Sequence, residues 1–171
     1  MPFITIQDLL SLKQQHPHSR LIGLDPGTVR LGVAISDSDW KIAVPLAIID
    51  AISPRRDAES LMALCADRQI GAVVLGYPLS LNGQEGPAAI KMREYGEKLQ
   101  LALQKNGVDW PFLLQDERMS TMAVSRSFTS EKPQQSGKAR ASGKKSQQKT
   151  APDSAAAVWI LQGALDTLPR N

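Results

Sequence analysis

Acidic residues stand at three places where this sequence predicts the end of a strand or the start of a helix. Asp25 ends an apolar run, Asp116 and Glu117 follow a second one, and Asp153 opens the last helical pattern. Such positions meet at one edge of an α/β sheet, where ligands usually bind. Converging carboxylates repel one another and raise a pKa unless a divalent cation lies between them. Oxygen-only ligands suit Mg²⁺ or Mn²⁺, so the pattern predicts a metal site able to support phosphodiester cleavage.

Each of these carboxylates also has a purely structural explanation. Asp25 could open a tight turn through its side chain, and Asp153 could complement the positive end of a helix. Asp116 and Glu117 could be solvated residues ahead of a helix cap, and their position alone does not choose between them. The joint pattern, with a basic segment directly before Asp153, favours a nuclease site.

The stretch that must position Asp25 reads as strand, tight turn and strand. Two apolar runs, 21–24 and 31–35, are separated by Pro26, Gly27 and Thr28. Glycine supplies turn geometry, and the flanking runs are rich in strand-forming residues. Glycines at 23, 27 and 32 would let a backbone, a phosphate or a metal approach Asp25 closely.

Periodicity and turn residues predict the remaining elements. Pro45 cannot donate to a sheet ladder, so its strand belongs at an edge. The apolar run 70–76 has the composition of a strand that is covered on both faces. We expect helices at 3–16, from Ser53-Pro54 onward, from the 77–87 loop to Asn106-Gly107, at 120–128 and at 152–168, and further strands at 43–49 and 110–115. The order predicts an α/β fold with a mixed five-stranded sheet flanked by helices.

Length and composition indicate an ordinary globular protein with one sizeable core. The chain has 171 residues, of which 42% are hydrophobic and 22% charged, and its apolar runs are too short for a membrane span. The single cysteine, Cys65, cannot form an internal disulfide, and its place on an apolar helix face predicts a core residue. His16 and His18 lack a second ligand pair for zinc. We expect a cytoplasmic protein without a signal peptide or membrane contact.

Positive charge is concentrated in one segment, 131–150. The formal net charge is only +3, yet this segment holds six of the 20 basic residues and one acidic residue. It has no apolar periodicity, which predicts a flexible loop. Lys144, Lys145 and Lys149 stand closest to Asp153, and we expect them to contact phosphates by sequence-independent attraction. The alternative is a solvated linker.

Four motifs in this sequence together resemble the YqgF (RuvX) family. They are Gly23 to Thr28 with Arg30, Gly32 to Ala34, Ser36 and Asp37; Val74 to Leu79 with Asn82-Gly83 and Glu85 to Pro87; Asp116 to Thr121; and Asp153 with Ala155-Ala156 and Ile160 to Gln162. They occur in the family's order and cover roughly residues 20 to 168. Residues 1–19 fall outside the pattern, so we expect an N-terminal helical extension followed by one nuclease domain over 20–171 that contains the flexible basic loop 131–150.

The resemblance implies an RNase H-like fold, similar to RuvC-type resolvases, and a metal-dependent nuclease. The family's described role is processing of the 5′ end of precursor 16S rRNA in ribosome biogenesis, and the alternative is Holliday junction resolution in DNA repair. When the family's motifs are matched to this sequence residue by residue, the resemblance implies Asp25, Glu117 and Asp153 as the catalytic and metal-binding carboxylates. The match favours Glu117 over Asp116. Nucleic-acid contacts are expected at Arg30, Asn82 and Arg118, besides the three lysines, and a plain turn is the alternative at Asn82.

The implied partners are precursor rRNA or branched DNA, and ribosomal particles if the role is rRNA processing. Symmetric cutting of a junction would need a homodimer, whereas trimming one RNA end would need only a monomer. Two rivals remain. The turn at 25–28 is similar to that of phosphate-binding ATPases, but the second motif and second lobe of those proteins are missing from the sequence. A non-enzymatic binder of structured nucleic acid would differ in lacking metal-dependent cleavage.

Overall fold

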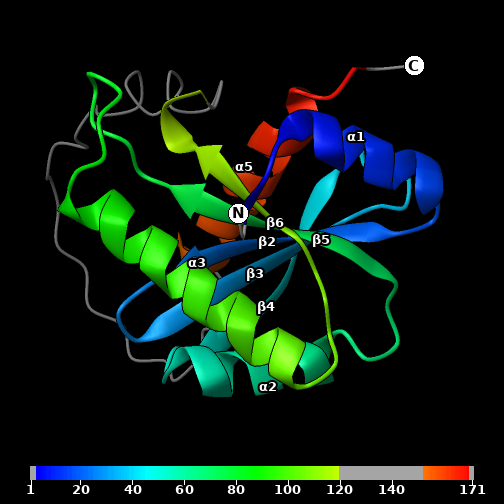
Figure 1. The fold of residues 1–171 in the computed structure, drawn as a ribbon, viewed down its shortest axis with the longest axis horizontal. Coiled ribbons are helices and arrows are strands. Elements are labelled where there is room, and N and C mark those ends of the chain that lie inside the picture. Colours follow the sequence, from blue (N-terminus) through cyan, green and yellow to red (C-terminus); the bar gives the residue numbers. More distant parts are fainter. Residues whose placement is uncertain (1–2, 120–151, 170–171) are drawn as a thin grey trace, which may run out of the picture.

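The computed structural model describes residues 3–119 and 152–169, which form a six-stranded sheet with helices on both faces (Figure 1). The strand order is β1-β6-β5-β2-β3-β4. The elements are β1 (Phe3–Ile4), α1 (Ile6–Gln15), β2 (Arg20–Pro26), β3 (Arg30–Ser36), β4 (Ala43–Asp50), α2 (Pro54–Leu64), β5 (Ile70–Tyr77), α3 (Pro87–Lys105), β6 (Phe112–Asp116), the 3-10 turn η1 (Glu117–Met119) and α5 (Pro152–Asp166).

The sheet is mixed, as the sequence predicts. β2 pairs antiparallel with β3 and parallel with β5, while β5 pairs parallel with β6. β4, which carries Pro45, is an edge strand beside β3. The carboxyl ends of β2, β5 and β6 therefore lie at one edge of the sheet, which we call the carboxyl edge.

A sixth strand joins the five predicted ones and corrects one element of the sequence analysis. Residues 3 and 4, expected in the first helix, form β1 and pair in parallel with Phe112 and Leu113 of β6. The cause is the helix cap. Thr5 and Asp8 form a reciprocal capping box that starts α1 at Ile6, so the two preceding residues stay extended and cover the otherwise open edge of β6.

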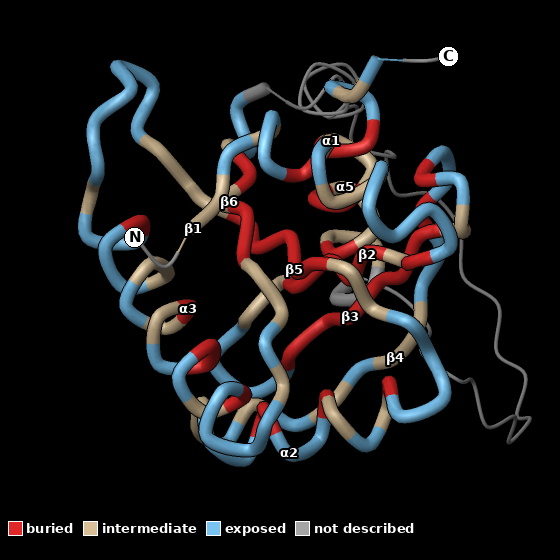
Figure 2. Tube along the Cα trace, turned by 45° about the vertical axis from the view of Figure 1, so that its right-hand side comes forward, coloured by how far each residue is buried: buried red, intermediate tan, exposed pale blue. Residues whose placement is uncertain are grey.

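Helices cover the two faces of the sheet in pairs. Leu9 of α1 and Leu161 of α5 belong to one core cluster, and Leu61 of α2 and Leu99 of α3 belong to the other. The side chains of neighbouring strand residues alternate between the two clusters, as a pleated strand requires. Figure 2 shows the buried sheet between these helical layers. Cys65 lies in the second cluster, where burial raises the pKa of its thiol to about 11, so the prediction of a core residue is confirmed.

Some sequence predictions lie outside the described residues. These are the helix at 120–128, the basic loop 131–150 and its three lysines, Lys144, Lys145 and Lys149. Within the described ranges, no helix combines the length and the apolar character needed to cross a membrane.

Candidate active site

The β2–β3 hairpin presents Asp25 at the carboxyl edge. The Gly27 N–H donates to the Arg30 carbonyl oxygen at 2.8 Å, which closes the turn. A β-carbon at Gly27 would lie 2.8 Å from that same oxygen, so the turn requires glycine. Asp25, Thr28 and Arg30 help to line an open hollow of about 410 Å³. The turn thus holds a carboxylate and a guanidinium beside one open hollow.

Glu117 reaches the same edge from β6. In the parallel ladder between β2 and β5, Leu24 is paired with Leu75, so the residues that follow them, Asp25 and Gly76, lie next to each other. Gly76 is also paired with Gln115 of β6, two residues before Glu117. The Glu117 Oε1 atom lies 2.7 Å from where a β-carbon at Gly76 would stand. The carboxylate of Glu117 therefore lies over Gly76, the residue next to Asp25 across the sheet.

Asp116 has a different environment from Glu117. The Arg118 guanidinium donates to both Asp116 carboxylate oxygens, with Nη2 to Oδ2 at 2.7 Å, and the Arg118 N–H donates to Oδ1 at 2.9 Å. The hydrogen bonds from the Arg118 side chain hold the pKa of Asp116 below its usual value, against the opposing effect of burial. Arg118 Nη1 also donates to the Leu81 carbonyl oxygen at 3.2 Å. Asp116 and Arg118 thus tie the loop after β5 to the end of β6.

Helix α5 brings the backbone of Asp153 toward this edge. A β-carbon at Gly23 would lie 2.6 Å from Leu161 Cβ and 2.8 Å from the Ala157 carbonyl oxygen, so α5 lies directly on β2. At the other end of the sheet, the Gln162 side chain accepts from the Ala43 N–H at 2.9 Å. The helix consequently runs away from the carboxyl edge, and its first turn, with Asp153, lies about 6 Å nearer that edge than Ala157.

The 77–87 loop borders the site and holds Asn82. Asn82 Oδ1 accepts from the Gln84 N–H at 3.1 Å, and Gly83 follows with a φ of 82°, so Asn82 serves a tight turn in this structure. The Tyr77 hydroxyl and Arg93 Nε both donate to Glu85 Oε1. These bonds hold the two ends of the loop, and the bond from Arg118 to the Leu81 carbonyl oxygen holds its middle.

This chain is similar in sequence to proteins of one known family. The family model "RuvX: Holliday junction resolvase" matches residues 19–167. This chain belongs to the RuvX family. A protein of Methylocella silvestris, described as "Putative pre-16S rRNA nuclease", is 36% identical over 154 residues, covering 90% of this chain and 86% of the relative. A protein of Caulobacter vibrioides with the same description is 36% identical over 168 residues, covering 98% of each chain.

The fold of this RuvX-family chain is also found in a solved structure. Thermus thermophilus RuvC, solved in complex with a Holliday junction substrate, superposes with a TM-score of 0.51 at 16% identity, covering 85% of this chain and 92% of RuvC. This likeness confirms the predicted RNase H-like α/β class, and the family model confirms the resemblance drawn from the four motifs.

The carboxyl edge fits a hard divalent cation of the kind the RuvX family implies. The donors brought there, Asp25 and Glu117, offer only carboxylate oxygens, which Mg²⁺ and Mn²⁺ prefer. The Glu117 carboxylate can lie beside β5 because residue 76 has no side chain. Among residues 3–119 and 152–169, no three acidic, histidine or cysteine side chains form a complete metal cluster. The predicted third ligand, Asp153, is described in its helical backbone and not in its side chain.

Sequence reasoning missed two parts of the site. Gly76 matters because the Glu117 side chain, which follows a different strand, occupies the space beside it. The sequence of β5 alone gives no sign of this beyond a glycine at the end of an apolar run. The Asp116–Arg118 ion pair was also missed, although the two residues stand only two positions apart. An acidic residue and an arginine at that spacing, just past a strand, is the signal that could have revealed the pair.

Proposed function

We propose that this chain is a metal-dependent nuclease that hydrolyses phosphodiester bonds at the carboxyl edge, with precursor 16S rRNA as its substrate. The observation that carries the proposal is the placement of Glu117 over Gly76, next to Asp25 across the sheet. Two carboxylates from strands far apart in sequence thereby share one edge, and the helix that carries Asp153 begins toward the same edge.

Asp25, Glu117 and Asp153 are the residues that would hold Mg²⁺ or Mn²⁺. When bound there, such a cation supplies an activated water and stabilises the leaving oxygen in phosphodiester hydrolysis. The protein's own part is to hold the carboxylates in place before substrate arrives. The β2–β3 turn fixes Asp25, the missing side chain at Gly76 leaves room for the Glu117 carboxylate, and the close packing of α5 on Gly23 fixes the direction from which Asp153 enters.

The residues around the carboxylates suit a nucleic-acid substrate. Arg30 lines the same hollow as Asp25 and would meet a phosphate on the substrate strand. Arg118 is bonded to Asp116 and Leu81, so its role is to position the loop that borders the strand. Lys144, Lys145 and Lys149 remain our candidates for further phosphate contacts in the basic loop.

Precursor rRNA is favoured over a DNA junction by the names of the relatives that match nearly the whole chain at 36% identity. The RuvC likeness, at 16% identity, concerns the fold. Trimming one RNA end needs a single site, so a monomer is sufficient, and the RNA would be presented on a ribosomal particle. Symmetric cutting of a Holliday junction would instead need a two-fold dimer.

The experiment compares two end-labelled substrates, an RNA carrying the precursor 16S 5′ leader and a four-way DNA junction. Each is incubated with Mg²⁺, with Mn²⁺ and with chelator. We expect metal-dependent cleavage of the RNA and much slower cleavage of the junction. Preferential cutting of the junction would replace the RNA assignment with that of a resolvase. Binding without cleavage in every condition would overturn the enzyme and leave a non-enzymatic binder.

A further inference from the structure

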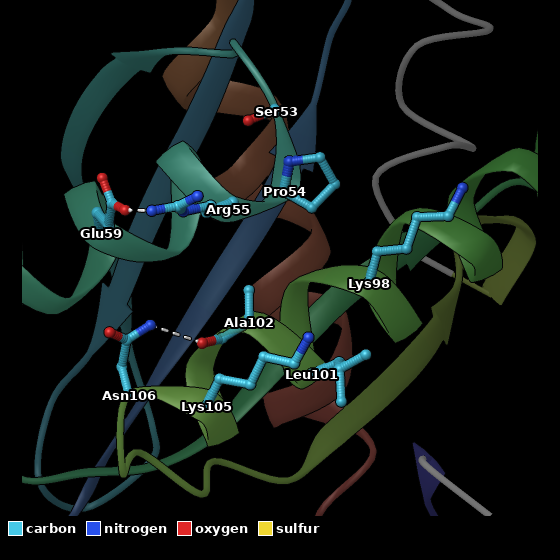
Figure 3. Close-up of a pocket in the computed structure, with 9 residues that line it drawn as sticks. All are labelled: Ser53, Pro54, Arg55, Glu59, Lys98, Leu101, Ala102, Lys105 and Asn106. Carbon is cyan, nitrogen blue, oxygen red and sulfur yellow. Dashed lines mark hydrogen bonds and ion pairs between the residues drawn. The ribbon is translucent and has the colours of Figure 1, made fainter.

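A second hollow lies on the opposite face of the sheet from α5, between the start of α2 and the last turns of α3. It has a volume of about 570 Å³. Figure 3 shows its residues: Ser53, the N-cap of α2, with Pro54 and Arg55 lies across from the part of α3 that carries Lys98, Leu101 and Lys105. We propose that this hollow binds the phosphodiester backbone of the nucleic-acid substrate outside the cleavage site. The inference rests on the proposed nuclease function and extends the surface that the substrate covers.

The charges of the hollow favour an anion. It is lined by three cationic side chains, Arg55, Lys98 and Lys105, and by one acidic side chain, Glu59. The Glu59 carboxylate lies 3.4 Å from Arg55 Nε and 3.9 Å from Arg56 Nη1, so it is already paired within α2. In the part of the chain that the structure describes, Lys98 and Lys105 form neither an ion pair nor a side-chain hydrogen bond. Their ammonium groups therefore keep their full set of donors for a ligand.

The spacing of the two lysines suits a strand of nucleic acid. Lys98 and Lys105 stand seven residues apart, two turns along one side of α3, which is about 10.5 Å. A stacked strand carries one phosphate about every 3.4 Å, so the pair spans about three nucleotides. Leu101 lies between them and is 52% exposed. Its apolar surface, with that of Ala102, can contact sugars while the ammonium groups contact phosphates.

The position of the hollow identifies the substrate, in preference to an unrelated anion, as its occupant. The Ala51 N–H donates to the Val29 carbonyl oxygen at 2.9 Å. Val29 lines the hollow of Asp25, and Ser53, two residues after Ala51, lines the hollow of Lys98. The intervening surface is exposed, with Val29 69% and Ile52 71% accessible. A strand held at the carboxyl edge can therefore continue over this segment into the second hollow.

The segment that joins the two hollows is firmly held. The buried Asp57 carboxylate accepts from the Ile52 N–H at 3.0 Å, from the Ser53 N–H at 3.3 Å and from the Tyr95 hydroxyl at 2.8 Å. These bonds connect α2, α3 and the residues after β4. The spacing between the hollows is thus fixed by the fold before any ligand binds.

The test is a binding titration in chelator, so that no cleavage is needed for the readout. Labelled precursor leader RNA is titrated with the full chain and with the double variant Lys98→Gln/Lys105→Gln over a range of salt concentrations. The matched control, Lys41→Gln/Arg68→Gln, removes the same charge at the sheet edge opposite Asp25, where Lys41 precedes β4 and Arg68 precedes β5. Thermal unfolding of all three proteins checks that each is folded.

We expect the hollow variant to bind the RNA about tenfold more weakly, with a salt slope reduced by about 2, and the control to bind like the unmodified chain. Equal affinities and slopes for the two variants would overturn the inference while leaving cleavage by the unmodified chain intact. Competition by polyglutamate as effective as that by RNA of equal charge would assign the hollow to an acidic protein and overturn the phosphate assignment. Failure of the unmodified chain to bind RNA would overturn the proposed function itself.

Discussion

The carboxylate of Glu117 occupies the space that a side chain at residue 76 would fill, with Oε1 2.7 Å from the position of a β-carbon on Gly76. The absence of a side chain at residue 76 lets Glu117, which follows β6, lie over β5 at the level of Asp25. Glycine at position 76 is therefore a requirement of the site, beyond any preference of the strand.

Replacing Gly76 by alanine is expected to reduce cleavage at only a small cost in stability. The new methyl would meet Glu117 Oε1 and Ile160 Cδ1, the ends of two flexible side chains, which can move aside at a cost of about 1 kcal/mol. Moving Glu117 displaces a proposed ligand, so we expect cleavage to fall by about tenfold or more. Denaturant unfolding and cleavage rates of Gly76→Ala, measured side by side, check this. Unchanged cleavage would show that activity does not depend on Glu117 lying over Gly76.

We expect Gly23→Ala to cost more stability than Gly76→Ala. Here the added methyl would meet the Ala157 carbonyl oxygen at 2.8 Å and Leu161 Cβ at 2.6 Å, and neither can move without shifting α5. We expect a loss of about 3 kcal/mol in the free energy of unfolding. Calorimetry measures this loss of stability. A loss no larger than that of Gly76→Ala would contradict the close packing of α5 on β2.

Removing the hydroxyl of Tyr95 should weaken the junction between α2 and α3. Tyr95 donates to Asp57, which is buried and accepts from two backbone N–H groups as well. A hydrogen bond to a buried carboxylate contributes about 1.5–3 kcal/mol, so Tyr95→Phe should lower the free energy of unfolding by that amount. Tyr77→Phe, at a mostly exposed bond in the 77–87 loop, is the matched comparison and should cost less. A reversed order of the two costs would contradict the assignment.

The two tyrosines of the chain should resist ionisation in the folded state. Burial, followed by the hydrogen bond to Glu85, raises the pKa of Tyr77 to about 12, and burial beside Asp57 raises the pKa of Tyr95 as well. Because the neutral forms are favoured in the folded protein, this stabilisation is complete below the unfolded pKa of about 10 and is lost as the pH rises above it. Spectrophotometric titration should show no tyrosinate near pH 10 before unfolding. Glu85→Gln should lower the pKa of Tyr77 alone.

Arg118→Gln should release the loop that borders the site. Without the guanidinium, the pKa of Asp116 rises toward its ordinary value and the bond to the Leu81 carbonyl is lost. In the unmodified chain the lowered pKa means that the ion pair stabilises the fold above the unfolded pKa of Asp116, and that this stabilisation is lost as the pH falls. We expect faster amide hydrogen exchange across residues 79–84 in the variant at neutral pH. Exchange equal to that of the unmodified chain would show that other contacts hold the loop.

The sequence was sufficient for the elements that depend on local pattern. The strand that leads to Asp25, the strand that leads to Asp116, the Ser53 cap and the end of α3 at its Asn106 cap were all predicted from turn residues and periodicity. It failed at Phe3–Ile4: the Thr5–Asp8 capping box marks where α1 begins, but the pairing of the two preceding residues with β6 depends on a strand far away in sequence. Position alone also left open the choice between Asp116 and Glu117, which the family resemblance made in favour of Glu117, because their different surroundings come from Arg118 and Gly76 and are visible only in three dimensions.

The most direct test of the account is the rate of Mg²⁺-dependent cleavage of precursor leader RNA by Asp25→Asn. Asp39→Asn is the matched control, since Asp39 is an exposed carboxylate in the turn between β3 and β4, at the opposite edge of the sheet. We predict that Asp25→Asn loses at least about 100-fold in rate while Asp39→Asn cleaves like the unmodified chain, with equal thermal stability. Equal cleavage by both variants would contradict a catalytic site at the carboxyl edge.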